Sequence, residues 1–176
     1  MIYALVFVVV ILILFLVVAA RQPDTFRVER FTIIAAAPAS VFAQVDDFHN
    51  WQHWSPYVEL DPNMQTTYSG APSGRGASMA WSGNNKAGTG TMTILEDRPG
   101  ELVRMKLQFT KPFAATNTAE FTFRTEGTQT HVTWAMLGKN SFMFKVMSTA
   151  MNMDKMVGRD FERGLAKLKT LTETQS

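Results

Sequence analysis

The first twenty residues, MIYALVFVVVILILFLVVAA, form an unbroken apolar run without a charged side chain, and Arg21 ends it. At a rise of about 1.5 Å per residue, a helix of this length spans about 30 Å, which matches the hydrocarbon thickness of a bilayer. We therefore predict a transmembrane helix over residues 1–20. The remainder of the chain must then fold as a domain that is tethered to the membrane.

The same run has a competing interpretation as a secretory signal, because Val18-Ala19-Ala20 offers small residues where a peptidase could cut. Three features favour a retained anchor. No Lys or Arg precedes the run, the run is longer than the roughly 7 to 15 apolar residues of a signal peptide, and it contains no polar break. A buried helix of a soluble protein would show a polar face, which this run lacks. We expect residues 1–20 to have the lipid bilayer as their partner.

Three basic residues, Arg21, Arg27 and Arg30, follow the apolar run, whereas no basic side chain precedes it. Basic residues near the end of a membrane span are enriched on the cytoplasmic side. The sequence therefore predicts a single-pass membrane protein whose domain lies on the cytoplasmic side.

The composition excludes several function classes. The formal net charge is +2, and the basic residues are interspersed with acidic ones, so no basic stripe indicates a nucleic-acid partner. The chain has no cysteine, which excludes disulfides, thiolate metal ligands and a cysteine nucleophile.

The first part of the domain combines one strand with two short helices. A polar linker is predicted over residues 21–27, because its proline cannot continue a helix. The run Val28–Ile34 is typical of a strand. The segments Pro38–Val45 and Phe48–Trp54 each place apolar side chains three or four residues apart, which predicts two short helices.

From Gln65 to Gly138, apolar and polar residues alternate between glycine-bearing turns, which indicates an antiparallel meander. From Met153 to Leu168, apolar residues recur every three or four positions and predict a long amphipathic helix. We assign one domain to residues 28–173 and a tail to residues 174–176. The predicted class is α+β: a curved antiparallel sheet of about six or seven strands wrapped around the C-terminal helix, with a wedge of space between the two layers.

Several short motifs follow this order of elements, among them Pro38-Ala-Ser-Val-Phe42, Trp51-Gln-His-Trp-Ser-Pro-Tyr57 and Gly88-Thr-Gly-Thr-Met-Thr-Ile94. Together with the final helix, the chain resembles the polyketide cyclase/dehydrase and lipid transport family of the START-like (SRPBCC) helix-grip superfamily. The resemblance covers nearly all of Val28 to Thr172. It implies an apolar cavity between the sheet and the C-terminal helix that holds hydrophobic ligands, and in some members the cyclisation or dehydration of a polyketide.

The candidates for the ligand cavity are the large side chains of the predicted inward faces. They are Trp54, Met79, Trp81, Met92, Phe109, Phe121, Phe123, Trp134, Met151 and Phe161. Methionine adapts its shape and can wall a cavity that accepts several apolar guests, but it also fills irregular gaps in a core. The same two interpretations apply to the tryptophans, which bury a large surface and must satisfy an indole N–H.

Catalytic and metal-binding patterns are weak. His49 and His53 lie four residues apart, but a zinc site needs at least one further protein ligand, and no Glu stands beside either residue. The side chains of Asp46 and Asp47 would point apart on a helix, so one of them is expected to cap the helix that follows. We therefore predict no metal site, no cofactor and no catalytic constellation.

Three functions are consistent with these patterns. We favour a membrane-anchored binding protein for a lipid or another small hydrophobic ligand, held between the sheet and the C-terminal helix, because the short linker keeps any cavity mouth near a lipid surface. One alternative is a cyclase- or dehydrase-type enzyme for a polyketide-like or aromatic substrate, with Tyr57, Tyr68 and Asn117 as loose candidates for a polar role. The other is a membrane-tethered interaction domain whose wedge is filled by its own side chains.

Overall fold

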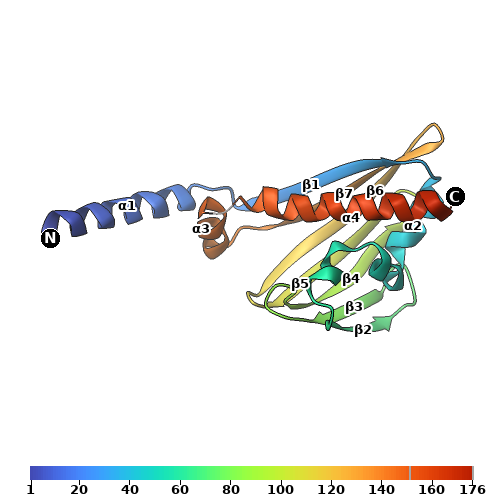
Figure 1. Ribbon diagram of the computed structural model, residues 1–176, viewed down its shortest axis with the longest axis horizontal. Coiled ribbons are helices and arrows are strands. Elements are labelled where there is room, and N and C mark those ends of the chain that lie inside the picture. The colour runs from blue at the N-terminus through green and yellow to red at the C-terminus, as the bar shows by residue number, and fades with distance from the viewer. Residues whose placement is uncertain (151, 176) are drawn as a thin grey trace.

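The computed structural model describes residues 1–150 and 152–175, apart from the side chains of Met143, Ala150 and Met153. Helix α1 (Ile2–Ala20) projects from one end of the domain (Figure 1). Nearly all of its side chains are exposed. With 19 residues and a mean hydropathy of 3.4, the helix is long and apolar enough to cross a membrane, by length and composition.

Seven strands form one antiparallel sheet in the order β1-β7-β6-β5-β4-β3-β2, as the strand count and the meander predicted. The strands are β1 (Thr25–Ile34), β2 (Gln65–Gly70), β3 (Ala77–Ser82), β4 (Thr89–Arg98), β5 (Leu102–Lys111), β6 (Ala115–Glu126) and β7 (Gln129–Lys139). Strand β1 begins inside the segment that the sequence assigned to the linker, because Thr25 and Phe26 already pair with Lys139 and Gly138. The connection from α1 to the sheet is therefore shortened to residues 21–24.

Three helices, rather than the two that were predicted, connect β1 to β2. They are α2 (Pro38–Asp46), η1 (Phe48–His53) and η2 (Pro56–Leu60). From the sequence, Ser55-Pro56 was expected to end the helical region. In the structure the Ser55 side chain caps η2 by accepting a hydrogen bond from the Tyr57 amide, and Pro56 takes the first helical position, where its missing N–H costs nothing.

The last two helices are α3 (Phe142–Ala150) and α4 (Met153–Gln175). The long helix α4 crosses the concave side of the sheet and buries Phe161, Leu165 and Leu168 against it, which confirms the helix-grip architecture (Figure 1). It runs through Gln175 and so includes residues that the sequence assigned to the tail.

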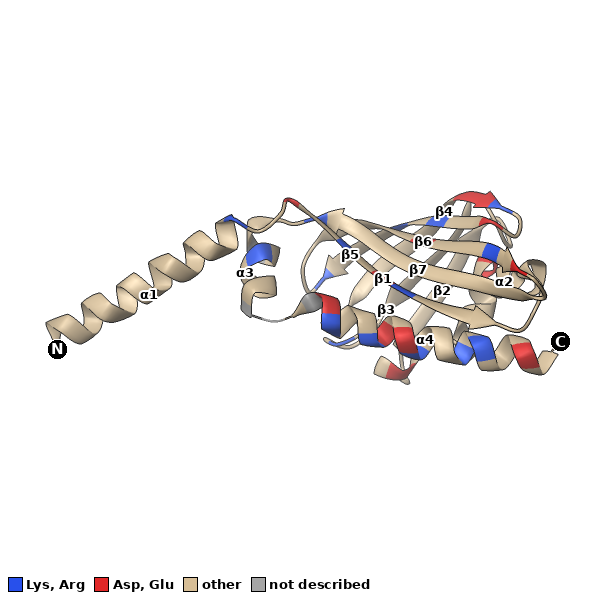
Figure 2. Cartoon of the chain, turned by 90° about the horizontal axis from the view of Figure 1, so that it is seen from above, with Lys and Arg blue, Asp and Glu red and all other residues tan. Residues whose placement is uncertain are grey.

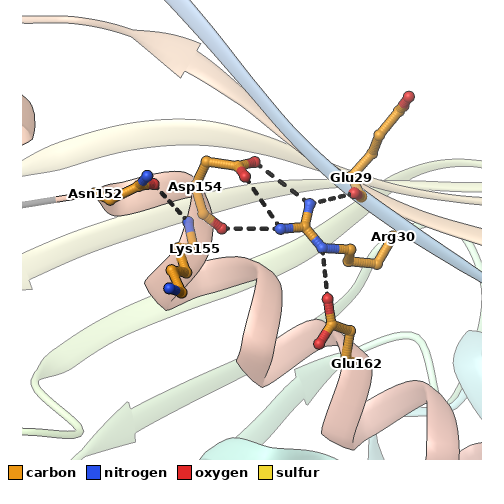
Figure 3. Close-up of polar contacts among 6 residues, drawn as sticks. All are labelled: Glu29, Arg30, Asn152, Asp154, Lys155 and Glu162. Carbon is orange, nitrogen blue, oxygen red and sulfur yellow. Dashed lines mark hydrogen bonds and ion pairs between the residues drawn. The ribbon is translucent and has the colours of Figure 1, made fainter.

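Arg30 fixes α4 to strand β1 (Figure 3). Its guanidinium reaches from the sheet to Glu162 (2.8 Å) and to the carboxylate of Asp154 (3.1 Å and 3.3 Å), and it donates a further hydrogen bond to the Glu29 carbonyl (2.7 Å). The hydrogen bonds that Arg30 donates to Asp154 and Glu162 raise the pKa of its guanidinium further above the ordinary value. Gly158 leaves room for the Arg30 guanidinium, because a Cβ at this position would lie 2.0 Å from Nη2.

Candidate functional site

The inner face of the sheet has a packed half beneath α4. Six of the ten predicted cavity residues lie in the buried core, and none of them exposes more than 5% of its surface. These are Trp54, Met92, Phe121, Phe123, Trp134 and Phe161. Burial to this degree leaves little of their surface available to a ligand.

Stacked aromatic rings fill the packed half. Phe161 of α4 lies nearly parallel to Trp134 of β7, with ring centroids 4.1 Å apart and an interplanar angle of 8°. Phe121 also stacks on this indole, at 4.8 Å, and Trp54 meets Phe121 and Trp134 edge-on. The Trp54 N–H donates to the Gln44 carbonyl at 3.0 Å, so its polar group is satisfied by the backbone. In this half the wedge is filled by the protein itself.

The other half of the inner face, which we call the open half, carries apolar side chains that are only partly buried. It consists of Phe26, Met79, Trp81, Leu107, Phe109 and Met136. Three of these were predicted cavity residues, namely Met79, Trp81 and Phe109. The tenth candidate, Met151, lies outside the described residues.

The strand register aligns the open half across the sheet. Phe26 pairs with Gly138, Gly138 with Asn117, and Asn117 with Leu107, and Leu107 pairs in turn with the buried Met92, where the row meets the packed half. Alternation along each strand predicts which side chains face inward, but it does not predict which of them become neighbours. The sequence analysis therefore missed Phe26, Leu107 and Met136 as members of one surface.

Trp81 and Phe109 form the end of the open half near the β3–β4 turn. Their rings meet edge-on at 5.6 Å, and the Trp81 N–H donates to the Ala87 carbonyl at 3.1 Å. The indole lies directly over Gly90, where a Cβ would come within 2.6 Å of the ring. Gly90 therefore determines how deeply Trp81 can sit on the sheet.

The open half lies at the end of the sheet from which α1 emerges. Phe26 is the second residue of β1, and its ring stacks on Phe144 of α3 at 5.2 Å. Helix α3 in turn contacts α1, whose Ala19 is fully buried (Figure 1). The partly exposed apolar surface and the hydrophobic helix are thus adjacent.

Two open hollows lie on the surface of the domain. One, of about 910 Å³, involves Phe26, Asn117 and Gly138 together with residues of the outer face, and the other, of about 570 Å³, lies along the first half of α4. Neither is enclosed between the sheet and α4.

The family model described as polyketide cyclase/dehydrase and lipid transport matches residues 25–173. The chain belongs to this family. Its helix-grip fold and this membership support a role in binding hydrophobic small molecules or in cyclase-like chemistry.

Solved structures with low sequence identity share the fold. CV1439 from Chromobacterium violaceum is 16% identical, with a TM-score of 0.59, and the match covers 86% of this chain and 99% of that one. MLL2253 from Mesorhizobium loti is 16% identical, with a TM-score of 0.61 and coverages of 86% and 98%. The Aha1 dimer from Colwellia psychrerythraea is 13% identical, with a TM-score of 0.60 and coverages of 84% and 96%. A search of curated proteins found no match.

The family description names a cyclase and a dehydrase, and such an enzyme would need its polar side chains close together. The polar candidates from the sequence are Tyr57, Tyr68 and Asn117. Tyr57 packs edge-on against Trp134 at 6.3 Å, and burial raises its pKa far above the ordinary value, so its hydroxyl stays protonated. Tyr68 stacks on His49 at 4.1 Å on the edge strand β2. Asn117 stands in the row of the open half. The fold therefore separates these three side chains.

The predicted cap is confirmed, because Asp47 caps η1. Its Oδ1 accepts a hydrogen bond from the His49 amide (2.8 Å) and lies 2.7 Å from His49 Nδ1. Burial, followed by the charges of Asp97 and Asp47, raises the pKa of Asp46. Among the described residues, no group of three His, Cys, Asp or Glu side chains could hold a metal ion.

Proposed function

We propose that this chain is a single-pass membrane protein whose cytoplasmic domain binds a lipid or another small hydrophobic molecule on the open half of its sheet. One observation carries the proposal: the inner face leaves its apolar side chains partly uncovered at the end that adjoins α1, and it packs them fully at the other end. The binding region is therefore displaced from beneath α4 toward the membrane.

The physical incentive for a ligand is the uncovered apolar surface. Each Å² of such surface that a ligand removes from water contributes about 25 cal/mol of favourable free energy. Met79 and Met136 at this surface can change rotamer to fit guests of different shape. A ligand with flexible apolar chains is better matched to this surface than a rigid polar metabolite.

The position of α1 supports a ligand taken from the bilayer. Residues 21–24 connect α1 to β1, and four residues span at most about 14 Å. The open half thus stays close to the surface of any membrane that α1 crosses. A tether of this length raises the effective concentration of membrane lipids at the binding surface.

Native mass spectrometry of the full chain, extracted from membranes in a mild detergent, tests the proposal. We expect copurified lipid on the wild-type protein and its loss from the Leu107→Asn variant, because an amide in the apolar row must be desolvated when the ligand binds. The matched control is Leu95→Asn, since Leu95 is 48% exposed on the opposite face of the sheet. A wild-type protein without bound lipid, or equal loss in both variants, would contradict the proposal.

A cyclase- or dehydrase-type enzyme is the second candidate, and Asn117 is the observation that favours it. This amide lies in the middle of the apolar row, and within the described part of the chain its side chain makes no hydrogen bond. An unpaired amide at an apolar surface can orient a substrate carbonyl or hydroxyl. Substrate turnover that is lost in Asn117→Leu while ligand binding persists would favour this candidate.

A further inference from the structure

The end of the domain nearest α1 combines exposed aromatic rings with unpaired basic side chains. Phe113, in the β5–β6 turn, is 60% exposed, and Phe142, at the start of α3, is 56% exposed. Neither ring takes part in the packing of the core.

Four exposed basic residues occupy the same end. Arg21 follows α1, Lys86 lies in the β3–β4 connection, and Lys111 and Lys139 end strands β5 and β7. The register brings these strand ends together, because Thr25 pairs with Lys139 and Thr89 pairs with Lys111. Within the described part of the chain, none of the four side chains forms an ion pair.

Acidic side chains at this end are already engaged. Asp24 is paired with Lys145 of α3 at 2.6 Å, and the hydrogen bond from Lys145 lowers the pKa of Asp24. Asp154 is paired with Arg30. Acidic residues such as Asp97, Glu101 and Glu126 belong to the opposite end of the sheet, where basic residues such as Arg98 and Arg104 accompany them, so acidic and basic side chains are mixed there (Figure 2).

Helix α3 is fixed where α1 ends. Besides the Lys145–Asp24 pair, Asn140 donates from its side chain to the Pro23 carbonyl at 2.8 Å and from its backbone to the Asp24 carbonyl at 2.8 Å. These contacts hold the exposed Phe142 beside the end of the apolar helix. A short amphipathic helix in this position is typical of one that lies in the interface of a bilayer.

We propose that this end of the domain docks onto an anionic lipid surface, with Phe113 and Phe142 inserted at the headgroup level and the four basic residues facing the phosphates. Aromatic side chains favour this region of the bilayer, and basic side chains close to it are attracted by anionic lipids. The inference rests on the proposed membrane anchor. It goes further by giving the domain one orientation, in which the open half faces the bilayer.

The absence of native cysteines provides a clean probe of docking. We would label the Ala114→Cys variant of the full chain, adjacent to Phe113, with an environment-sensitive fluorophore and reconstitute it in nanodiscs. One preparation contains phosphatidylcholine alone, and the other contains phosphatidylcholine with phosphatidylglycerol. We expect a blue-shifted emission and quenching by spin-labelled lipid in the anionic nanodiscs.

Charge variants test the contacts. Each of Lys111→Ser and Lys139→Ser should lower the ratio of docked to undocked protein about fivefold, since one basic residue near an anionic surface contributes about that factor. The control for the two lysine variants is Arg124→Ser, which changes an exposed basic residue on the far part of β6. Phe113→Ser tests the inserted ring. Its control is Phe31→Ser, because Phe31 is 66% exposed on the outer face of β1.

The possible outcomes are distinct. Emission that is identical in both nanodiscs, or equal effects of the test and control variants, would overturn the docking surface while leaving the anchor and ligand binding intact. A chain that does not float with vesicles would overturn the anchor, and docking with it. Docking without copurified lipid would support this inference and contradict the proposed ligand.

Discussion

The packed half and the open half belong to the same face of the same sheet, yet they differ in what covers them. Beneath α4, Trp134 stacks with both Phe161 and Phe121 and is 3% exposed. Near α1, Trp81 rests on Gly90 and meets Phe109 edge-on, and it is only partly buried. The difference shows that one sheet face can be packed closely at one end and leave apolar side chains partly exposed at the other.

The largest effect should come from truncating the two tryptophans. Trp134→Ala removes a buried ring that stacks with Phe121 and Phe161 and should cost about 3–5 kcal/mol of stability. Trp81→Ala should cost less than about 2 kcal/mol, because part of this ring is already in water, and it should reduce copurified lipid. Denaturant unfolding measures both losses. Equal losses would mean that the two halves do not differ.

The attachment of α4 to β1 is the next test. Gly158→Ala places a Cβ where the Arg30 guanidinium lies, so Arg30 must withdraw from Asp154 and Glu162. We expect a loss of about 1 kcal/mol, because the Asp154 and Glu162 side chains are largely exposed and such ion pairs contribute about 0.2–1 kcal/mol each. Lys155→Ala, an exposed change on the same helix, is the control and should stay within about 0.5 kcal/mol. A melting curve for Gly158→Ala that matches the control would contradict this role of Arg30.

Asn117 distinguishes binding from catalysis in the open half. Asn117→Leu completes the apolar row and should strengthen the retention of an apolar ligand by about twofold to tenfold, as expected when a polar group no longer needs to be desolvated. Thr118→Leu, at the next position and on the outer face, should leave retention unchanged. Retained lipid quantified by mass spectrometry decides the matter, and weaker binding by Asn117→Leu would indicate that the amide contacts a polar group of the ligand.

The smallest effect concerns pH. Because the pKa of Asp46 is raised above its ordinary value of 3.8, the folded state binds more protons than the unfolded state just above that pH. Stability from this group therefore falls as pH rises through the window between the two pKa values. Asp46→Asn should raise the melting temperature at pH 7 and flatten its dependence between pH 4 and neutrality; a lower melting temperature would show that the carboxylate is stabilising.

Much of the fold was predictable because its causes are local. The uninterrupted run Met1–Ala20, the alternation from Gln65 to Gly138 and the helical spacing after Met153 each follow from side-chain periodicity. Helix η2 was missed because Ser55-Pro56 both ends one helix and starts another. The early start of β1 was missed because its pairing partners are more than a hundred residues away.

The site was less predictable for the same reason. The pattern placed Trp81 and Trp134 on inward faces without distinguishing them, since what separates them is whether α4 passes over each ring. Arg30 was interpreted as part of a basic cluster next to the membrane, but its contacts with Asp154 and Glu162 depend on how the chain folds back after more than a hundred residues.

Photolabelling in a bilayer tests the central claim most directly. The full chain would be reconstituted in nanodiscs that contain a phospholipid with a diazirine in its acyl chain, and the labelled peptides would be identified by mass spectrometry. Ligand binding in the open half predicts labels on the inward residues of β3, β5 and β7, including Met79, Leu107 and Met136, and their loss in Leu107→Asn. Labels confined to α1 would contradict it.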